Sequence, residues 1–259
     1  MLRFSANLSL LFTEAELIER FQLAKQHGFN AVEIQFPYCL SPETIGRILS
    51  EQQLELVLFN VNADDLLQGG EGLASVPKKQ EQFQQAVSDA VTYARHLKPK
   101  AINVLPGRCF NKKRLPEYLD TFKKNLCFAA DAFSPLGIIT VFEAINSHDM
   151  PGFIIDNSKK MLEVLMEINR PDVFMQYDIY HAVMMGENPA DFIRQYAEKI
   201  GHIQFADCPG RGQPGTGQID FRTLFSDIKK SAYSAWVGAE YKPVGTTLES
   251  LSWMLPIEL

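Results

Sequence analysis

The sequence contains little of what marks several large classes of protein. Its four cysteines include no Cys-x-x-Cys pair, and a chain of 259 residues needs no disulfides to hold a core, which favours a reducing, cytoplasmic setting. No run approaches 18 consecutive apolar residues, so no α-helical membrane span is expected. Acidic residues outnumber basic ones, 31 to 25, which argues against nucleic acid as a partner. A small anionic substrate needs only one or two local cations and stays open.

Strand and helix patterns alternate along the whole chain. The apolar start, residues 1–12, carries one basic residue and is interrupted by Asn7, so it is interpreted as a first strand and not as a targeting signal. Further strands are predicted at residues 31–36, 54–61, 101–105, 138–143, 173–178, 200–204 and 235–240. Eight strands in alternation with about eight helices, without a linker or a shift in composition, predict one domain over residues 1–259. The predicted fold is a closed (β/α)8 TIM barrel of parallel strands.

Local signals mark the starts of the first two helices. Thr13 with Glu16 three residues later has the form of a capping box, and Gly28 follows the expected end of that helix. Ser41 and Pro42 occupy the N-cap and first-turn positions that each residue favours. The longer connections follow the strands, at residues 62–76, 106–115, 146–157 and 207–220, and barrel active sites are built from such loops.

Four oxygen donors end four successive predicted strands. Glu143, Asp178, Gln204 and Glu240 are spaced by 35, 26 and 36 residues, about one strand-plus-helix unit each. The carboxyl ends of parallel strands meet at one face of a barrel, so these side chains are expected to share a site. Three carboxylates and one amide oxygen are typical ligands of Mg²⁺ or Mn²⁺, whereas Zn²⁺ would call for histidine or cysteine.

Three more residues are candidates for binding a substrate. Arg211 lies in a glycine-rich loop after the seventh strand and could grip a carboxylate with two parallel hydrogen bonds. That loop contains a formal GxGxxG, but Pro214 interrupts it and no helix follows closely, which argues against a dinucleotide site. His181, three residues after Asp178, and Lys242, two after Glu240, are the other candidates. His202 is interpreted as an interior, hydrogen-bonded histidine.

Several segments together resemble the hydroxypyruvate isomerase family, one of the xylose-isomerase-like barrels. The resemblance covers nearly the whole chain. It is carried by FSANLS at 4–9, VEIQFPY at 32–38, FEAIN at 142–146, DMPGF at 149–153, DIYH at 178–181, HIQFAD at 202–207, PGR at 209–211, PGTG at 214–217 and EYKP at 240–243.

The resemblance implies a metal-dependent isomerase that interconverts hydroxypyruvate and tartronate semialdehyde through an enediolate. It implies that Glu143, Asp178, Gln204 and Glu240 hold the metal, and that Glu143 and Glu240 also move the proton. Related ketose epimerases typically have histidine where this chain has Gln204, which favours the isomerase branch. Gln218 is a departure, because the family more often has glutamate there.

Other functions remain open at this point. A 2-oxo-tetronate isomerase would perform the same chemistry on a longer acid. A ketose epimerase would act on a neutral sugar and would not need Arg211 as a carboxylate clamp. A metal-dependent nuclease should show more histidine ligands and a basic surface, and a non-catalytic binding protein would exchange no substrate protons. The sequence also leaves open a homo-oligomer, and whether the loop after the third strand closes over the substrate.

Overall fold

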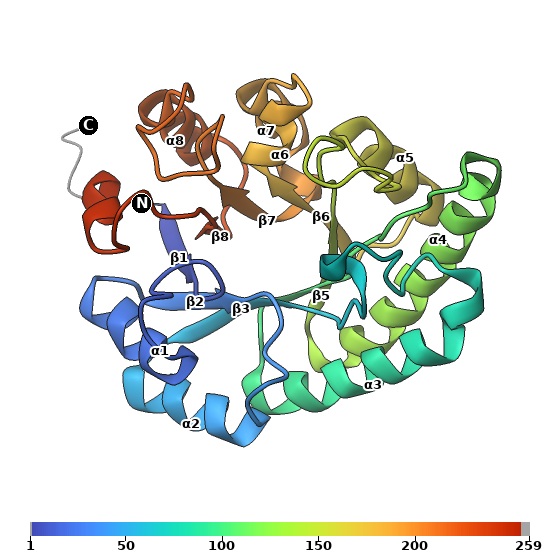
Figure 1. Ribbon diagram of the computed structural model, residues 1–259, viewed down its shortest axis with the longest axis horizontal. Helices are drawn as coiled ribbons and strands as arrows, with labels where there is room; N and C mark the ends of the chain where they lie inside the picture. The colour runs from blue at the N-terminus through green and yellow to red at the C-terminus, as the bar shows by residue number, and fades with distance from the viewer. Residues whose placement is uncertain (1, 255–259) are drawn as a thin grey trace.

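The computed structural model describes residues 2–254, which form a closed barrel of eight parallel strands in the order β1 to β8. Helices surround the strands on the outside (Figure 1). This arrangement confirms the predicted (β/α)8 fold. The strands are Arg3–Asn7 (β1), Ala31–Ile34 (β2), Glu55–Asn60 (β3), Ala101–Asn103 (β4), Ile139–Glu143 (β5), Val173–Asp178 (β6), Ile200–Phe205 (β7) and Trp236–Ala239 (β8). Strands buried on both faces account for their nearly continuous apolar runs.

Apart from α6, the helices follow the strands as the sequence patterns predict. They are Leu17–Gln26 (α1), Pro42–Gln52 (α2), Gln80–Leu97 (α3), Leu115–Phe133 (α4), Ser158–Ile168 (α5), Ile179–Met184 (α6), Pro189–Tyr196 (α7) and Phe221–Lys230 (α8). Among the described residues, six short 3-10 helices, η1 to η6, lie between or after them: Leu66–Gln68, Pro77–Lys79, Lys112–Arg114, Ser134–Leu136, Ala197–Lys199 and Glu249–Met254. Within residues 2–254, no helix combines the length and apolar character that crossing a membrane requires.

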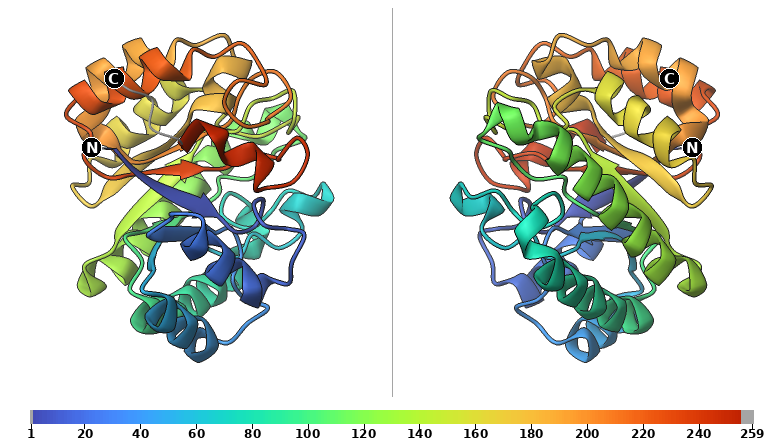
Figure 2. Two further views of the ribbon diagram at one scale, coloured as in Figure 1. Left: turned by 90° about the vertical axis from the view of Figure 1, so that its left-hand side faces the viewer. Right: turned by 90° about the vertical axis from the view of Figure 1, so that its right-hand side faces the viewer.

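The two ends of the described chain meet where the barrel closes. β1 pairs with β8 in parallel, with Phe4 opposite Val237. The last 3-10 helix, η6, packs beside this seam (Figure 2), and the Trp253 ring lies 5.1 Å from that of Phe4. The Trp253 ring, in the last described turn of the chain, therefore packs over the seam.

The N-terminal capping box is a wrong prediction. Helix α1 begins at Leu17, and its N-cap residue is Glu16, whose side chain makes no capping bond. The preceding segment is instead held by Thr247: its hydroxyl accepts from the Phe12 N–H, and its own N–H and hydroxyl donate to the Glu14 carboxylate. A tertiary contact thus replaces the local cap. The Ser41–Pro42 start of α2 is confirmed, with Ser41 Oγ accepting from the Thr44 N–H.

Candidate active site

A cavity of about 100 Å³ opens at the carboxyl end of the barrel strands. One part of its wall is apolar, with Phe36, Leu67, Leu105, Ile145 and Met150. The other part is polar and contains three of the four predicted oxygen donors, Glu143, Gln204 and Glu240. Asp178, the fourth donor, is buried against His181 and Arg211, which both line the cavity. Parallel strand ends bring the four together, as their spacing along the chain predicts.

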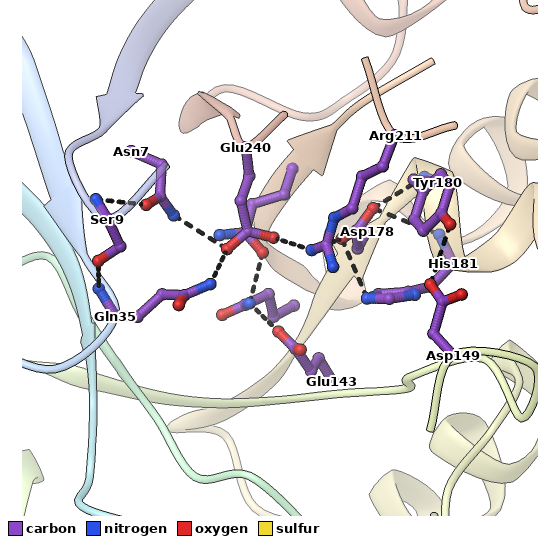
Figure 3. Close-up of polar contacts among 12 residues, drawn as sticks. Asn7, Ser9, Gln35, Glu143, Asp149, Asp178, Tyr180, His181, Arg211 and Glu240 are labelled. Atoms are coloured by element: carbon purple, nitrogen blue, oxygen red, sulfur yellow. Dashed lines mark hydrogen bonds and ion pairs between the residues drawn. The ribbon is translucent and has the colours of Figure 1, made fainter. Parts of the chain in front are cut away.

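Arg211 extends into the middle of this set (Figure 3). Its Nη2 lies 2.7 Å from Glu240 Oε2 and 3.6 Å from Asp178 Oδ2. The loop that carries Arg211 is held by the buried carboxylate of Asp207, which accepts the backbone N–H groups of Cys208, Gly215, Gly217 and Ile219. Arg211 itself has a left-handed backbone, φ 57°, so the surrounding contacts must fix this strained turn.

The three carboxylates are held under conditions that oppose full ionisation. Burial and the neighbouring charges of Glu240 and Asp178 raise the pKa of Glu143 well above its usual value. Burial also raises the pKa of Asp178 and of Glu240, although Arg211 opposes the shift in both. Burial alone would lower the pKa of Arg211, but Glu240, Asp178 and Glu143 raise it above its usual value. If all three carboxylates were ionised, the site would hold more negative charge than one guanidinium can balance.

Asp178 connects the cavity to helix α6, which the sequence patterns did not reveal. Asp178 is the N-cap of α6, and its Oδ1 accepts the N–H groups of Tyr180 and His181. Its other oxygen, Oδ2, faces Arg211 and His181. The strand therefore fixes the backbone of Asp178, and the first N–H groups of the helix fix its side chain.

His181 is a neutral hydrogen-bond donor in this site. Asn146 Oδ1 accepts from the His148 and Asp149 N–H groups, so its amide nitrogen faces His181 Nδ1 at 2.7 Å. Nδ1 is then the acceptor, and the ring proton lies on Nε2, 3.5 Å from Asp178 Oδ2. Burial, followed by the charge of Arg211, lowers the pKa of His181 to about 3. His181 can thus offer a substrate a hydrogen bond, but not a positive charge.

Glu240 is oriented by two amides from the opposite side of the barrel. Its Oε1 accepts from Asn7 Nδ2 and from Gln35 Nε2, each at 2.9 Å (Figure 3). Ser9 supports both amides, since its N–H donates to Asn7 Oδ1 and its hydroxyl accepts from the Gln35 N–H. Glu240 lies one residue beyond β8, and these contacts set the direction in which its carboxylate points.

Gln176 lies between Glu143 and Gln204, the other two predicted oxygen donors. Its Nε2 donates to Glu143 Oε2 and, at 2.6 Å, to Gln204 Oε1. Across residues 2–254, no three histidine, cysteine, aspartate or glutamate side chains surround a common point as metal ligands. The donor set still has the chemistry of a cation site: three buried carboxylates face one guanidinium, so two negative charges are in excess when all are ionised. A divalent cation would balance that excess, and the amide oxygen of Gln204 is a suitable neutral ligand.

Lys242 is not brought into the cavity. Its side chain is exposed, it does not line the cavity, and only its backbone is engaged there, through an N–H that donates to the Arg211 carbonyl. Sequence reasoning also missed several polar residues of the site. These are Asn7, Glu33, Gln35, Asn103, Asn146 and Gln176. Asn7 and Asn103 end β1 and β4, so the strand-end signal that identified the four donors applied to them too.

A barrel whose strand ends carry buried carboxylates around one arginine has the architecture of a TIM-barrel enzyme. Comparison with known proteins shows which family of TIM-barrel enzymes the chain resembles. The family model described as "Xylose isomerase-like TIM barrel" matches residues 21–257. The chain is 41% identical over 256 residues to hydroxypyruvate isomerase of Escherichia coli, covering 99% of both chains. It is 34% identical to 2-oxo-tetronate isomerase of Pectobacterium atrosepticum, covering 99% of this chain and 98% of the relative.

A solved structure has the same fold. The crystal structure titled AP endonuclease, family 2, from Brucella melitensis superposes with a TM-score of 0.95 at 35% identity, covering 99% of each chain. The chain belongs to the xylose isomerase-like TIM barrel family and, within it, to the group of hydroxypyruvate and 2-oxo-tetronate isomerases.

Proposed function

We propose that this chain is a divalent-metal-dependent isomerase that interconverts hydroxypyruvate and tartronate semialdehyde. The single observation that carries the proposal is the buried group of Glu143, Asp178 and Glu240 around Arg211 in a small cavity. Full-length likeness to hydroxypyruvate isomerase supports the substrate. The free state of all four cysteines supports the proposed cytoplasmic setting.

Glu143, Asp178, Gln204 and Glu240 would hold the cation, Mg²⁺ or Mn²⁺. When bound, the cation supplies Lewis acidity that lowers the pKa of the substrate C–H and stabilises the developing negative charge. Asp178 and Gln204 serve only as ligands in this scheme. Glu143 and Glu240 have a second role as the acid–base pair. Burial raises the pKa of both carboxyl groups above the usual value, which suits groups that must take up and return a proton.

The reaction needs no outside oxidant. A carboxylate removes one proton from C3 of hydroxypyruvate, and the electron pair of that C–H bond forms the C2–C3 double bond of an enediolate. The C3 hydroxyl loses its proton as C3 becomes the aldehyde, while the C2 oxygen gains one as the ketone becomes an alcohol. A carboxylic acid then returns a proton to C2. Arg211 binds the substrate carboxylate, and His181 adds a neutral donor through its Nε2 proton.

The size and charge of the cavity help to distinguish between the possible substrates. At about 100 Å³ it is smaller than the roughly 300 Å³ at which drug-sized pockets begin, so it suits an acid of three or four carbons better than a nucleotide. Arg211 is the one lysine or arginine that lines the cavity among the described residues, and its positive charge favours an acid over a neutral ketose. A 2-oxo-tetronate isomerase is the second candidate, favoured by the 34% identical relative, and would use the same residues.

One assay tests the proposal. Purified protein is stripped with EDTA and supplied with Mg²⁺ or Mn²⁺, and turnover of hydroxypyruvate and of 2-oxo-tetronates is followed in ²H₂O. We expect turnover only with metal, deuterium in the product, and a higher kcat/KM for hydroxypyruvate. A higher kcat/KM for 2-oxo-tetronates selects the second candidate. Full activity after EDTA treatment overturns the metal role.

A further inference from the structure

A fourth buried carboxylate, Glu33 of β2, lies beside the proposed metal ligands. It is fully buried, and four side chains donate hydrogen bonds to it. Ser5 Oγ and His202 Nε2 donate to its Oε2 at 3.1 and 2.8 Å, and Asn7 Nδ2 and Gln204 Nε2 donate to its Oε1 at 3.0 and 2.7 Å. A carboxylate surrounded by four donors on both oxygens is well stabilised in its charged form.

The barrel leaves room for this carboxylate at Gly238. Gly238 of β8 is opposite Ser5 on one side and Gln204 on the other. A Cβ atom at this position would overlap the Glu33 carboxylate, with Oε1 only 2.7 Å away. The backbone of Gly238 is not in the left-handed region, so glycine is needed there for space and not for conformation. The sequence of a second strand is thus adapted to the Glu33 side chain.

The hydrogen bonds around Glu33 determine which end of the Gln204 amide faces it, because both Glu33 oxygens accept from Ser5, His202 and Asn7. A carboxylate can only accept, so the NH₂ group of Gln204 must face Glu33. The oxygen of Gln204 then faces the opposite way, where it accepts from Gln176 beside Glu143.

We propose that Glu33 is a positioning residue that fixes the Gln204 amide with its oxygen toward the metal. It also reaches the acid–base residue Glu240, because Asn7 Nδ2 donates to both Glu33 Oε1 and Glu240 Oε1. The inference rests on the metal site of the proposed function. His202 acts through Glu33, which gives this interior histidine a role beyond filling the barrel.

A purely structural role for Glu33 makes a different prediction. If it only holds the barrel together, replacing it lowers the free energy of unfolding but leaves the metal affinity of the folded protein unchanged. If it orients Gln204, the isosteric variant Glu33→Gln loses metal affinity, because an amide both donates and accepts and so does not dictate which end of Gln204 faces it. Partners that orient metal ligands typically contribute about 10- to 100-fold in metal affinity.

The test is calorimetric titration with Mn²⁺ of four proteins, each checked for folding by thermal unfolding. They are wild type, Glu33→Gln, the exchange Glu33→Gln/Gln204→Glu, and Thr140→Val. Thr140 is a control from the barrel wall, a buried residue whose hydroxyl has no partner among the described residues. The exchange reverses donor and acceptor while keeping the charge of the pair, so an oxygen again faces the metal.

We expect Glu33→Gln to weaken Mn²⁺ binding about 10- to 100-fold, the exchange to recover most of that loss, and Thr140→Val to change it less than threefold. Wild-type affinity in Glu33→Gln, an equal loss in Thr140→Val, or no recovery in a folded exchange variant would each overturn the inference. If the wild type itself binds no Mn²⁺, the metal site of the proposed function is wrong. That outcome differs from wild-type affinity in Glu33→Gln, which would contradict only the positioning role of Glu33.

A crystal structure of the wild type with Mn²⁺ covers the case in which Glu33→Gln does not fold. We expect Gln204 Oε1 on the metal and Gln204 Nε2 still donating to Glu33. An occupied metal site with Gln204 turned away from the ion, or with its bond to Glu33 broken, would overturn the inference.

Discussion

Arg211 and Glu240 form a largely buried ion pair, with Arg211 Nη2 2.7 Å from Glu240 Oε2, so the cation proposed to bind substrate contacts a proposed catalytic base. The same guanidinium lies 3.6 Å from Asp178. Entry of a metal among these carboxylates would compete with Arg211 for them. The released guanidinium would then be available for the substrate carboxylate.

Replacement of Arg211 by methionine should therefore separate substrate binding from metal binding. We expect kcat/KM for hydroxypyruvate to fall about 100-fold, mostly through KM, because a charge-assisted, two-bond contact to the carboxylate is lost. Mn²⁺ affinity should be kept or increased, since the competing cation is gone. Arg222→Met, at an exposed position of α8, is the matched control. A kcat/KM within threefold of wild type would exclude Arg211 as the carboxylate clamp.

Replacement of Glu240 by glutamine tests the acid–base role. We expect kcat to fall by about 10²- to 10⁴-fold with the fold retained, because the amide cannot accept the proton. The measurement is kcat together with exchange of the substrate C3 proton for deuterium, which reports proton removal alone. Gln35→Leu, which removes one of the two amides that orient Glu240, should cost less than Glu240→Gln. Near-wild-type exchange in Glu240→Gln would contradict the assignment.

Stability at acidic pH should depend on the Arg170–Asp172 pair. Two hydrogen bonds from Arg170, at 2.9 and 2.8 Å, lower the pKa of Asp172 below its usual value. Because the folded pKa is the lower one, the pair stabilises the fold at pH values above about 4, and this contribution is lost as the pH falls through the folded pKa. Asp172→Asn should lower the free energy of unfolding by about 1 kcal/mol at pH 7.

The pH dependence of urea unfolding between pH 3 and 7 measures this effect. The wild type should lose more stability than Asp172→Asn over the acidic part of that range. Asp227→Asn, in α8, serves as the control because Asp227 has no ion pair within residues 2–254. Parallel curves for wild type and Asp172→Asn would show that the pair contributes nothing.

Two glycines should respond in opposite ways to alanine. At Gly201 of β7, a Cβ would lie 2.8 Å from side-chain atoms of both Ile139 and Val141, so Gly201→Ala should cost about 1–3 kcal/mol by overpacking. At Gly46 of α2, the nearest atom would be 3.7 Å away, an ordinary contact. Gly46→Ala should gain about 0.5–1 kcal/mol from helix propensity. Thermal or urea unfolding of both variants measures the difference, and a neutral Gly201→Ala would contradict the packing argument.

Most strand ends could be predicted from the sequence, because buried parallel strands have apolar runs that end abruptly at polar residues. Glu143 and Asp178 end their strands as predicted, and Glu240 lies one residue beyond β8. The helix after β6 was not predicted. Ile179–Met184 is only six residues long, too short for a periodic pattern, and its start depends on the Asp178 cap.

Contacts between side chains far apart in the sequence could not be predicted. Glu33 and His202 are 169 positions apart, yet their side chains meet because the barrel closes. Lys242 was a candidate because it lies two residues from Glu240, but its side chain is exposed at the barrel mouth. Spacing along the chain identifies which strand end a residue occupies, but not the direction in which its side chain points.

The sequence by itself determined the alternating pattern, the parallel barrel and the set of strand-end oxygen donors, because burial and strand period are local properties that a chain carries in its residue order. Only the tertiary structure decided the neutral state of His181, the ion pair of Arg211 with Glu240 and the orientation of Gln204 by Glu33. Protonation and hydrogen-bond direction depend on burial and on charges brought from opposite sides of the barrel, and these exist only once it has closed.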